Sequence, residues 1–417
     1  MLGLLIVLLV VTAIAVASLL YWNTLVSLYP EPLRCEEITT ITTGDLWKLR
    51  LCRYRKGRNV GEPILFVHGA GANHHNFTCP EGESLVDFLM QKGYDCWAID
   101  LRGTRSSRPP FGHNHFDVSL EDHLDEDLPS VIAHIRRVTG YDRLHWAGHS
   151  MGGMLLYAYA LAHGEEQIAA GITIASPPGF ENVTLPPVER PLALLRRMPY
   201  FGCACIRALL PIQLRLRITS PLLPVNLANL HPDITIRHFF NMMDNVQPGV
   251  MGELVAAARE GGWHMRNGAL DMQAGLTRLH VPLLAFFAMH DPFVPLAEAR
   301  TFFERLPSDD KRAIYLGKSE GASADYAHIE IPFARESHRE VFQPILAWLR
   351  AHPITPGEPA STKPEQERYS PPPSHQQRKD ILSGSSFQHV VKNSDEAPPP
   401  EPPSPEANGR EDQSPPA

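Results

Sequence analysis

The sequence lacks an excess of positive charge. Its 417 residues include 38 Lys and Arg against 46 Asp and Glu, which gives a formal net charge of −8. Proteins that bind nucleic acid need basic surfaces that neutralise phosphates, and no run of this sequence interleaves basic and aromatic residues in that way. We therefore expect no nucleic-acid partner. The 43% hydrophobic and 20% charged residues are normal for a globular protein.

Cysteine is also scarce, with six residues in the whole chain. Four of these could form two disulfides: Cys35 with Cys52, and Cys79 with Cys96. Their spacing does not decide whether the disulfides form. The sequence Cys203-Ala-Cys205 is typical of two buried thiols rather than of half a metal site.

The first thirty residues contain no charged side chain. The run from Leu2 to Leu20 is almost wholly apolar and is long enough to span a bilayer. Aromatic residues of the kind enriched at membrane interfaces follow it, namely Tyr21, Trp22 and Tyr29. A cleaved signal peptide is the alternative, because residues 15–17 resemble a cleavage site, but the usual basic N-terminal region is missing. We predict an uncleaved single-pass membrane anchor over residues 1–30.

The side of the membrane on which the rest of the chain lies stays open. The basic residues near the apolar run all follow it, beginning at Arg34, and most stand beyond the strongest reach of the positive-inside rule, so they favour a cytosolic domain only weakly. Two sequences of the type Asn-x-Thr, at Asn76 and Asn182, would be glycosylated only in a secretory pathway. Cleavage of the apolar run would instead give a secreted or periplasmic protein.

The C-terminal end, residues 353–417, is rich in Pro, Ser, Glu and Gln and poor in residues that could form a core. This composition predicts a disordered tail. Its proline tracts, such as Ser-Pro-Pro-Pro-Ser, could bind a partner with an aromatic-lined groove, although most such tracts are simply solvated.

Between these ends, residues 31–352 alternate strand-like and helix-like segments, which favours a mainly parallel sheet with helices on both faces. Short apolar runs mark six expected strands, at residues 63–69, 94–100, 143–149, 170–176, 282–291 and 312–317. The segment 119–138 has helical periodicity, with Ser119 and Asp122 as its N-terminal cap. Pro129 inside this segment is expected to kink the helix.

Reactive groups in an open parallel sheet gather at the carboxyl ends of the strands. Ser150, in the sequence Gly-His-Ser-Met-Gly, directly follows the expected strand 143–149. A serine hydroxyl needs a base to remove its proton and a sharp strand-to-helix turn to present it, and this turn requires small neighbours such as Gly148, Gly152 and Gly153. A serine that only caps a helix is the structural alternative. We predict that Ser150 is a nucleophile.

The loop that follows the expected strand 63–69 contains His-Gly-Ala-Gly-Ala. A His-Gly loop at this place can turn a backbone N–H toward an oxyanion. We expect Ala70 to supply this donor, with Gly71 as the second choice, and Met151 to supply the other. His68 is expected to hold the loop rather than to act as the base.

His74 and His75, further along the same loop, invite a metal interpretation. No third ligand stands at a convincing spacing from them. We therefore interpret the two histidines as the polar rim of a pocket, and we expect no metal and no cofactor.

The acid and the base of a triad should follow later strands. Asp291 stands where the apolar strand 282–291 stops abruptly, whereas its rivals Asp244 and Asp271 do not directly follow a strand. His328 lies in a loop between the last strand and a closing helix, whereas His338 falls inside that helix. We predict Asp291 as the acid that orients the base, and His328 as the base.

The order Ser150, Asp291, His328, downstream of a His-Gly loop, resembles the α/β-hydrolase superfamily over about residues 60–350. The sequence at 100–107, Asp-Leu-Arg-Gly-Thr-Arg-Ser-Ser, is similar to a loop of that family, but Arg105 stands where a second glycine is usual and should reshape one wall of the site. The lead-in and the His-Gly loop look like the acid-lipase and polyhydroxyalkanoate-synthase branch. Those synthases use a cysteine nucleophile, so Ser150 favours hydrolysis. The resemblance implies an α/β-hydrolase fold and a Ser-His-Asp triad that works through an acyl-enzyme.

A long insert, residues 177–275, separates the fourth and fifth expected strands. It is rich in Leu and Pro with scattered Arg, which suits a helical cap with an apolar inner side, although a cap with a purely structural core is equally compatible. Together with the anchor, the insert favours a lipid or another hydrophobic ester as substrate.

We therefore predict a membrane-anchored serine hydrolase, of the lipase or esterase kind, that cleaves carboxylic esters. An acyltransferase is the alternative within enzymes, because it differs only in which nucleophile reaches the acyl-enzyme. A catalytically silent interaction protein that works through its proline-rich tail is the alternative outside enzymes. The presence of a complete set of site residues favours the enzyme.

Overall fold

A computed structural model describes residues 2–57, 61–177, 179, 199–218, 224–266 and 268–356. The predicted tail beyond residue 356, the second Asn-x-Thr sequence at Asn182 and part of the predicted cap lie outside these residues.

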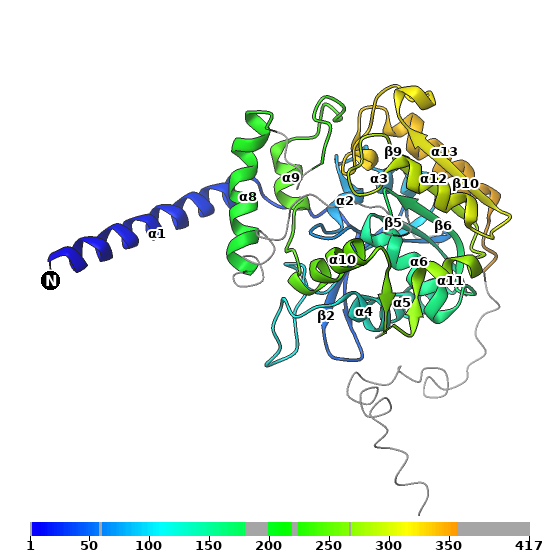
Figure 1. The fold of residues 1–417 in the computed structure, drawn as a ribbon, viewed down its shortest axis with the longest axis horizontal. Coiled ribbons are helices and arrows are strands. Elements are labelled where there is room, and N and C mark those ends of the chain that lie inside the picture. Colours follow the sequence, from blue (N-terminus) through cyan, green and yellow to red (C-terminus); the bar gives the residue numbers. More distant parts are fainter. Residues whose placement is uncertain are drawn as a thin grey trace, which may run out of the picture. The chain divides into compact units, whose positions relative to one another are not determined.

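The chain is organised around an eight-stranded sheet (Figure 1) with the strand order β1-β2-β4-β3-β5-β6-β9-β10. Strand β2 pairs antiparallel with both β1 and β4, and the remaining neighbours are parallel. The strands are β1 (Glu37–Thr42), β2 (Lys48–Tyr54), β3 (Pro63–Val67), β4 (Asp95–Asp100), β5 (Leu144–His149), β6 (Ile168–Ile174), β9 (Leu283–Ala288) and β10 (Lys311–Leu316). All six expected strands are therefore present, and the mainly parallel sheet is confirmed.

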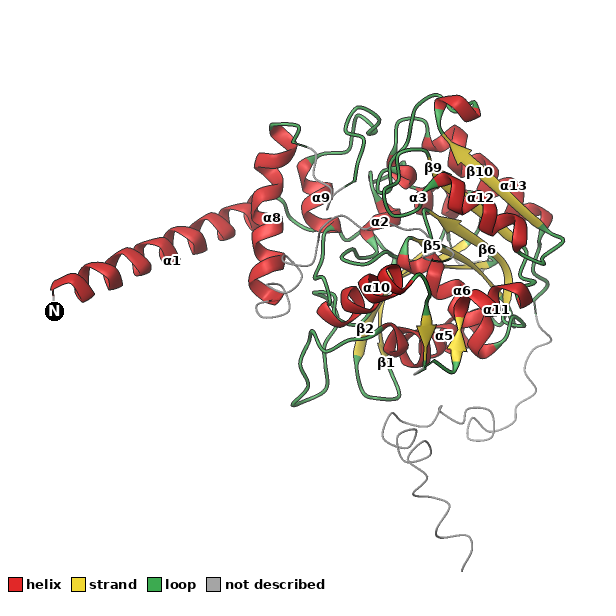
Figure 2. Ribbon diagram, in the orientation of Figure 1, coloured by secondary structure: helices red, strands yellow, loops and turns green. Residues whose placement is uncertain are grey.

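Both faces of the sheet are covered, as Figure 2 shows, which explains why the central strands are apolar throughout. In β3, Leu65 and Val67 belong to the core cluster on one face, whereas Ile64 and Phe66 belong to the cluster on the other. Successive side chains of a strand point to opposite faces, so a strand buried on both sides needs an apolar residue at every position.

Helices connect the strands. The main ones outside the insert are α3 (Leu85–Gln91), α5 (Leu128–Thr139), α6 (Met151–His163), α12 (Leu296–Arg305) and α13 (Gln343–Ala351). The predicted N-terminal helix cap at Ser119 is present, because Ser119 and Asp122 form a capping box at the start of the short helix α4 (Leu120–Asp122). A π-helical turn, His123–Asp127, joins α4 to α5, so the helix is continuous over residues 120–139. Pro129 stands just after this turn, where the regular α-helical hydrogen bonding is already interrupted.

The insert between β6 and β9 is mainly helical in its described part. It contains α8 (Pro199–Arg215), α9 (Ile236–Met242), α10 (Pro248–Glu260) and the short α11 (Met272–Gly275). It also contains a feature that we did not predict, the two-stranded antiparallel pair β7 (His264–Met265) and β8 (Leu270–Asp271). A separate small core joins α8 and α9 through Leu210, Phe239 and Met242.

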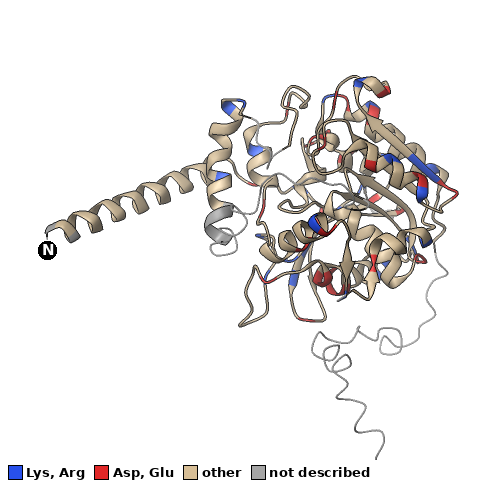
Figure 3. Ribbon diagram, viewed as in Figure 1, with Lys and Arg blue, Asp and Glu red and all other residues tan. Residues whose placement is uncertain are grey.

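The N-terminal helix α1 spans Leu2–Leu28. Its segment Leu5–Leu28 is long and apolar enough to cross a membrane, and its most apolar stretch is not buried against the protein. A signal sequence would share these features. Figure 3 shows that no charged side chain interrupts it.

The cysteines with described side chains are free thiols, so the structure contains neither of the two pairs considered from the sequence. Cys205 is half-buried, which corrects the expectation of a buried thiol. Asn76 is buried, with 1% of its surface exposed, so its Asn-x-Thr sequence is a poor glycosylation acceptor in the folded protein.

Candidate active site

Ser150 stands between β5 and α6 in a backbone conformation that non-glycine residues rarely adopt, with φ 52° and ψ −118°. Its neighbours must be glycines. A Cβ on Gly148 would lie 2.4 Å from the backbone of Gly152, one on Gly152 would lie 1.9 Å from the Val67 oxygen, and one on Gly153 would lie 2.0 Å from Ser176 Oγ. The turn can therefore form only because residues 148, 152 and 153 have no side chain.

The three residues predicted for the triad lie together. The imidazole of His328 is 2.9 Å from Ser150 Oγ through Nε2 and 2.7 Å from Asp291 Oδ2 through Nδ1. Each residue follows the carboxyl end of a strand: Ser150 follows β5, Asp291 follows β9 and His328 follows β10. The carboxylate accepts the Nδ1–H, which leaves Nε2 as the acceptor for the serine hydroxyl.

Asp291 is itself held in place by the backbone. Its second oxygen, Oδ1, accepts hydrogen bonds from the N–H groups of Phe293 at 2.9 Å and Val294 at 3.2 Å. Both Asp291 and His328 are buried. The carboxylate is thus oriented from both sides, and its charge is available to stabilise an imidazolium on His328.

Sequence reasoning missed the role of His149, the residue before Ser150. Its Nε2–H donates to the main-chain oxygen of His328 at 2.9 Å, so it ties the nucleophile turn to the loop that carries the base. Burial and the neighbouring His328 lower the pKa of His149 to about 3, which keeps its ring neutral. The position of His149 directly before the serine in Gly-His-Ser-Met-Gly could have pointed to this role.

The His-Gly loop approaches the serine closely. A Cβ on Gly69 would lie 3.1 Å from Ser150 Cβ, and Gly71 has φ +68°, which favours glycine. Within the described part of the chain, the N–H groups of Ala70 and Met151 have no backbone acceptor. That these two groups form the oxyanion hole stays a prediction.

The other candidates lie elsewhere. His338 contacts the edge of Phe88, with ring centroids 5.0 Å apart, and Asp271 caps α11 by accepting from the N–H of Ala274 at 3.1 Å. His68 holds its loop, because its Nδ1 is 2.8 Å from the Gly69 oxygen and its Nε2 is 3.2 Å from the Leu101 nitrogen.

Asp244, the remaining rival for the acid, explains the unusual Arg105. The Arg105 N–H donates to Asp244 Oδ1 at 2.8 Å, its Nε lies 3.2 Å from Asp244 Oδ2, and its Nη2 donates to the Asn241 oxygen at 2.7 Å. The arginine that replaces the usual glycine therefore fastens the loop after β4 to the end of α9 in the insert.

The interpretation of His74 and His75 as a pocket rim was wrong, because both are buried. His74 Nδ1 lies 2.9 Å from Asp100 Oδ1, and His75 Nε2 lies 3.1 Å from Glu31 Oε1. The ligand atoms of Glu31, His74 and His75 lie within 4.8 Å of one another, close enough to hold a metal ion. A cation is already there, however, because Arg50 pairs with Glu31 at 2.7 Å and with Asp100 at 2.6 Å.

The residues of this network shift one another's pKa values. Burial alone would raise the pKa of Asp100, but His74 and Arg50 beside it hold that pKa well below its usual range. Burial and the adjacent His74 lower the pKa of His75 to about 4. The network therefore joins the segment after α1 to the loop after β3 through an arginine and two carboxylates.

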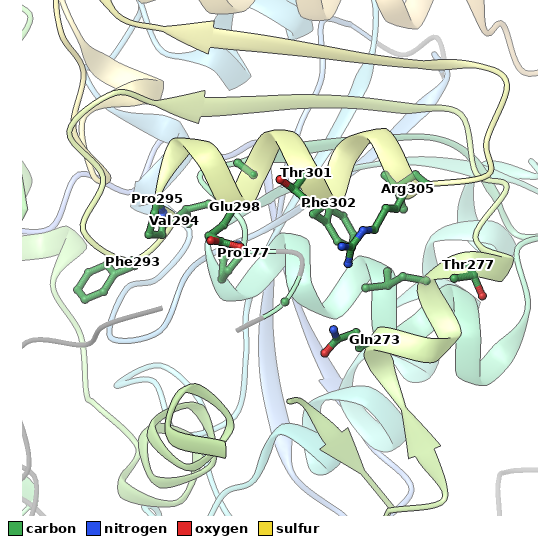
Figure 4. A pocket seen from close by; sticks show the side chains of 14 residues that line it. Pro177, Gln273, Thr277, Phe293, Val294, Pro295, Glu298, Thr301, Phe302 and Arg305 are labelled. Atoms are coloured by element: carbon green, nitrogen blue, oxygen red, sulfur yellow. The ribbon is translucent and has the colours of Figure 1, made fainter. Parts of the chain in front are cut away.

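A pocket of about 110 Å³ is lined by Phe293 and Val294, which follow Asp291 in the chain, but by none of the three triad residues (Figure 4). Phe293 and Arg305 lie at opposite ends of it, and the ring of Phe293 meets the ring of His328 edge-on at 5.0 Å. Its apolar wall is formed mainly by α12 and its flanks, with the residues Leu276, Phe293, Val294, Pro295, Ala299, Phe302 and Leu306.

Comparisons with known proteins identify the fold family of the chain. A family model described as alpha/beta hydrolase fold matches residues 62–318. Lipase 1 of Drosophila melanogaster is 34% identical over 122 residues, which cover 28% of this chain and 27% of that protein. Gastric triacylglycerol lipase of Bos taurus is 30% identical over 144 residues, covering 32% and 34%. The matching segment thus spans about a third or less of each of these relatives.

Among solved structures, a thermophilic esterase from Thermogutta terrifontis is similar in fold. It superposes with a TM-score of 0.50 at 22% sequence identity, covering 76% of this chain and all of that protein.

Proposed function

The chain belongs to the alpha/beta hydrolase fold family, and from that premise we propose that it is a membrane-anchored serine hydrolase that cleaves carboxylic esters of lipid-like substrates. The observation that carries the proposal is the continuous hydrogen-bonded chain from Ser150 through His328 to Asp291. Residues 31–352 form the catalytic domain, the insert 177–275 forms its cap, and residues 1–30 anchor it.

The reaction proceeds in two halves. Ser150 Oγ attacks the carbonyl carbon of the ester while its proton passes to His328 Nε2. The tetrahedral intermediate then collapses, the bond to the alcohol oxygen breaks, and the alcohol leaves with the proton from Nε2. Water attacks the acyl-enzyme in the same way, which releases the carboxylic acid and restores the serine.

The backbone supports the charge that develops in each half. The N–H of Met151, at the first position of α6, has no acceptor within its helix. Together with the N–H of Ala70 it would bind the oxyanion, in a site where water is partly excluded. Asp291 stabilises the imidazolium that forms on His328.

The substrate class rests on two observations. The pocket lined by Phe293, whose ring contacts that of His328, has mainly aliphatic and aromatic side chains, which suits an acyl chain. The relatives matched by sequence include a lipase and a triacylglycerol lipase.

A fluorophosphonate probe tests the proposal, because it reacts with an activated serine. Wild-type protein should be labelled and should hydrolyse p-nitrophenyl esters at a rate that depends on the length of the acyl chain. Ser150→Ala should lose both properties. If the folded Ser150→Ala protein is labelled and hydrolyses esters as wild type does, the proposed nucleophile is wrong. If folded wild-type protein is neither labelled nor active, a protein that works as a silent scaffold becomes the better interpretation.

A further inference from the structure

Helix α8 of the insert has an exposed apolar stripe. Within the helix, Leu209 is 57% exposed and Ile212 is 50% exposed. Just past its end, Leu216 is 65% exposed and Ile218 is 52% exposed. Leu209, Ile212 and Leu216 are spaced by three and four residues, so they share one face of the helix. Single exposed leucines are common on the surfaces of soluble proteins, but several apolar side chains exposed along one helix face indicate a binding surface.

The opposite face of α8 is buried and connects to α1. Arg207 is buried, its guanidinium lies 5.1 Å from the ring of Trp22 and 4.2 Å from the ring of Phe240, and its Nε donates to the Phe240 oxygen at 3.0 Å. Tyr21 Oη donates to the Ala208 oxygen at 2.9 Å. Figure 1 shows α8 beside the C-terminal part of α1, in agreement with these contacts.

These contacts fix the level of α8 relative to α1. Tyr21 and Trp22 are the aromatic residues that mark one end of the apolar run, and such residues lie at the headgroup level of a membrane. Ala208 is bonded to Tyr21, and Leu209 is the next residue. The stripe therefore begins at the level where α1 leaves the acyl-chain region.

The charge around the stripe fits a phospholipid surface. Arg215 and Arg217, at the C-terminal end of α8, are exposed. They also line a groove of about 460 Å³ whose other walls include Leu214, Leu227 and Ile234. A helix with an apolar face and arginines beside it is suited to lie in the interface plane of a bilayer with anionic lipids.

We propose that α8 lies in the surface of the same bilayer that α1 crosses, with Leu209, Ile212 and Leu216 among the acyl chains and Arg215 and Arg217 at the lipid phosphates. The inference rests on the anchor of the proposed function. It adds that the insert itself is a membrane-binding element, which holds the catalytic domain in one orientation against the lipid.

Photo-crosslinking of the full chain tests this arrangement. In vesicles of phosphatidylcholine and phosphatidylglycerol, p-benzoylphenylalanine in place of Ile212 should form a phospholipid adduct that mass spectrometry detects. The same group in place of Ile14, in the middle of α1, reports the anchor separately. Leu46 is the matched control, because it is 63% exposed in the turn between β1 and β2 and has no place in the proposed surface.

The outcomes separate the two claims. Lipid adducts at positions 14 and 212 but not at 46 support the proposal. Adducts at 14 alone leave the anchor intact and overturn the proposal for α8, as does an adduct from 212 to a second copy of the chain. Adducts at 212 without any at 14 support binding by α8 and overturn the anchor.

A kinetic measurement is the second test. The triple variant Leu209→Gln, Ile212→Gln, Leu216→Gln should hydrolyse a water-soluble short-chain ester as wild type does, because its changes lie on an exposed helix face. Its turnover of a long-chain ester embedded in vesicles should fall about tenfold. Leu46→Gln should leave both rates unchanged. Equal turnover of the vesicle-borne ester by wild type and triple variant would contradict the proposal.

Discussion

Replacing Ser150 by glycine should give a more stable protein than replacing it by alanine, and both replacements should abolish turnover. The serine has φ 52° and ψ −118°, outside the regions that residues with a Cβ normally occupy. A residue held in such a region costs about 1–3 kcal/mol, and glycine removes most of that cost. Ser150→Ala is the matched variant, because it deletes the same hydroxyl and the same hydrogen bond to His328 but keeps the Cβ.

The expected difference between the two variants can be worked out. Glycine gains about 1–3 kcal/mol from the relieved backbone and loses about 0.4–1 kcal/mol through the greater freedom of its unfolded chain. At the middle of these ranges, Ser150→Gly should be more stable than Ser150→Ala by about 1.3 kcal/mol. With an unfolding entropy of about 2 cal/mol/K per residue over a domain of about 320 residues, the difference in Tm is about 2 °C.

Thermal unfolding of both variants, in the same detergent and with ester turnover measured in parallel, provides the assay. Both should be inactive, and the glycine variant should unfold at the higher temperature. An alanine variant that is as stable as the glycine variant or more stable would show that the nucleophile turn stores no backbone strain, and the reasoning from its dihedral angles would fail.

Three further predictions concern the surroundings of Ser150. Asp291→Asn should lower kcat by about 10⁴-fold, since it disturbs the tautomer and charge of the base, whereas His338→Gln should leave kcat within a few-fold of wild type in the same ester assay. His149→Phe should lower kcat because the loop of His328 loses its tie to the nucleophile turn. The variant should also lose less stability than wild type as the pH falls, which thermal unfolding from pH 3 to 7 would measure. The neutral ring of His149 contributes stability that is present above the unfolded pKa of about 6.5 and is lost as pH falls toward about 3. An unchanged dependence of Tm on pH would count against the assignment. Arg105→Gly should destabilise the protein by about 1–3 kcal/mol in chemical unfolding, because it leaves the buried Asp244 without its cation, and a neutral effect would show that the loop and the insert are not coupled there.

Most of the sheet was predictable because its central strands are buried on both faces and therefore read as unbroken apolar runs. The two N-terminal strands were not recognised. In β2, Lys48 and Arg50 alternate with apolar residues, but Arg53 falls on the apolar face, so the segment is easily taken for a polar lead-in. Arg53 is nevertheless buried, because Asp95 on the neighbouring strand β4 accepts two hydrogen bonds from it at 2.9 and 2.7 Å. That compensation depends on a residue about forty positions away.

The site residues also differed in whether the local sequence could predict them. Ser150, Asp291 and His328 could be predicted because each comes directly after, or in the loop after, an apolar strand, and parallel strands end at the same edge. The environment of His74 and His75 could not, because Glu31 and Arg50 reach them from the lead-in to the sheet. Local sequence patterns do not reveal which distant carboxylate will neutralise a buried base.

The connection between α1 and Glu31 has a kinetic consequence. Helix α1 ends at Leu28, and Glu31 is already fixed to Arg50 at 2.7 Å and to His75 at 3.1 Å. Three residues extend over at most about 10 Å, so an enzyme anchored by α1 could not swing away to sample the surrounding water. Its search for substrate would be two-dimensional. The rate would then follow the mole fraction of ester within the membrane, and diluting the vesicles at constant lipid composition would leave the turnover per enzyme unchanged.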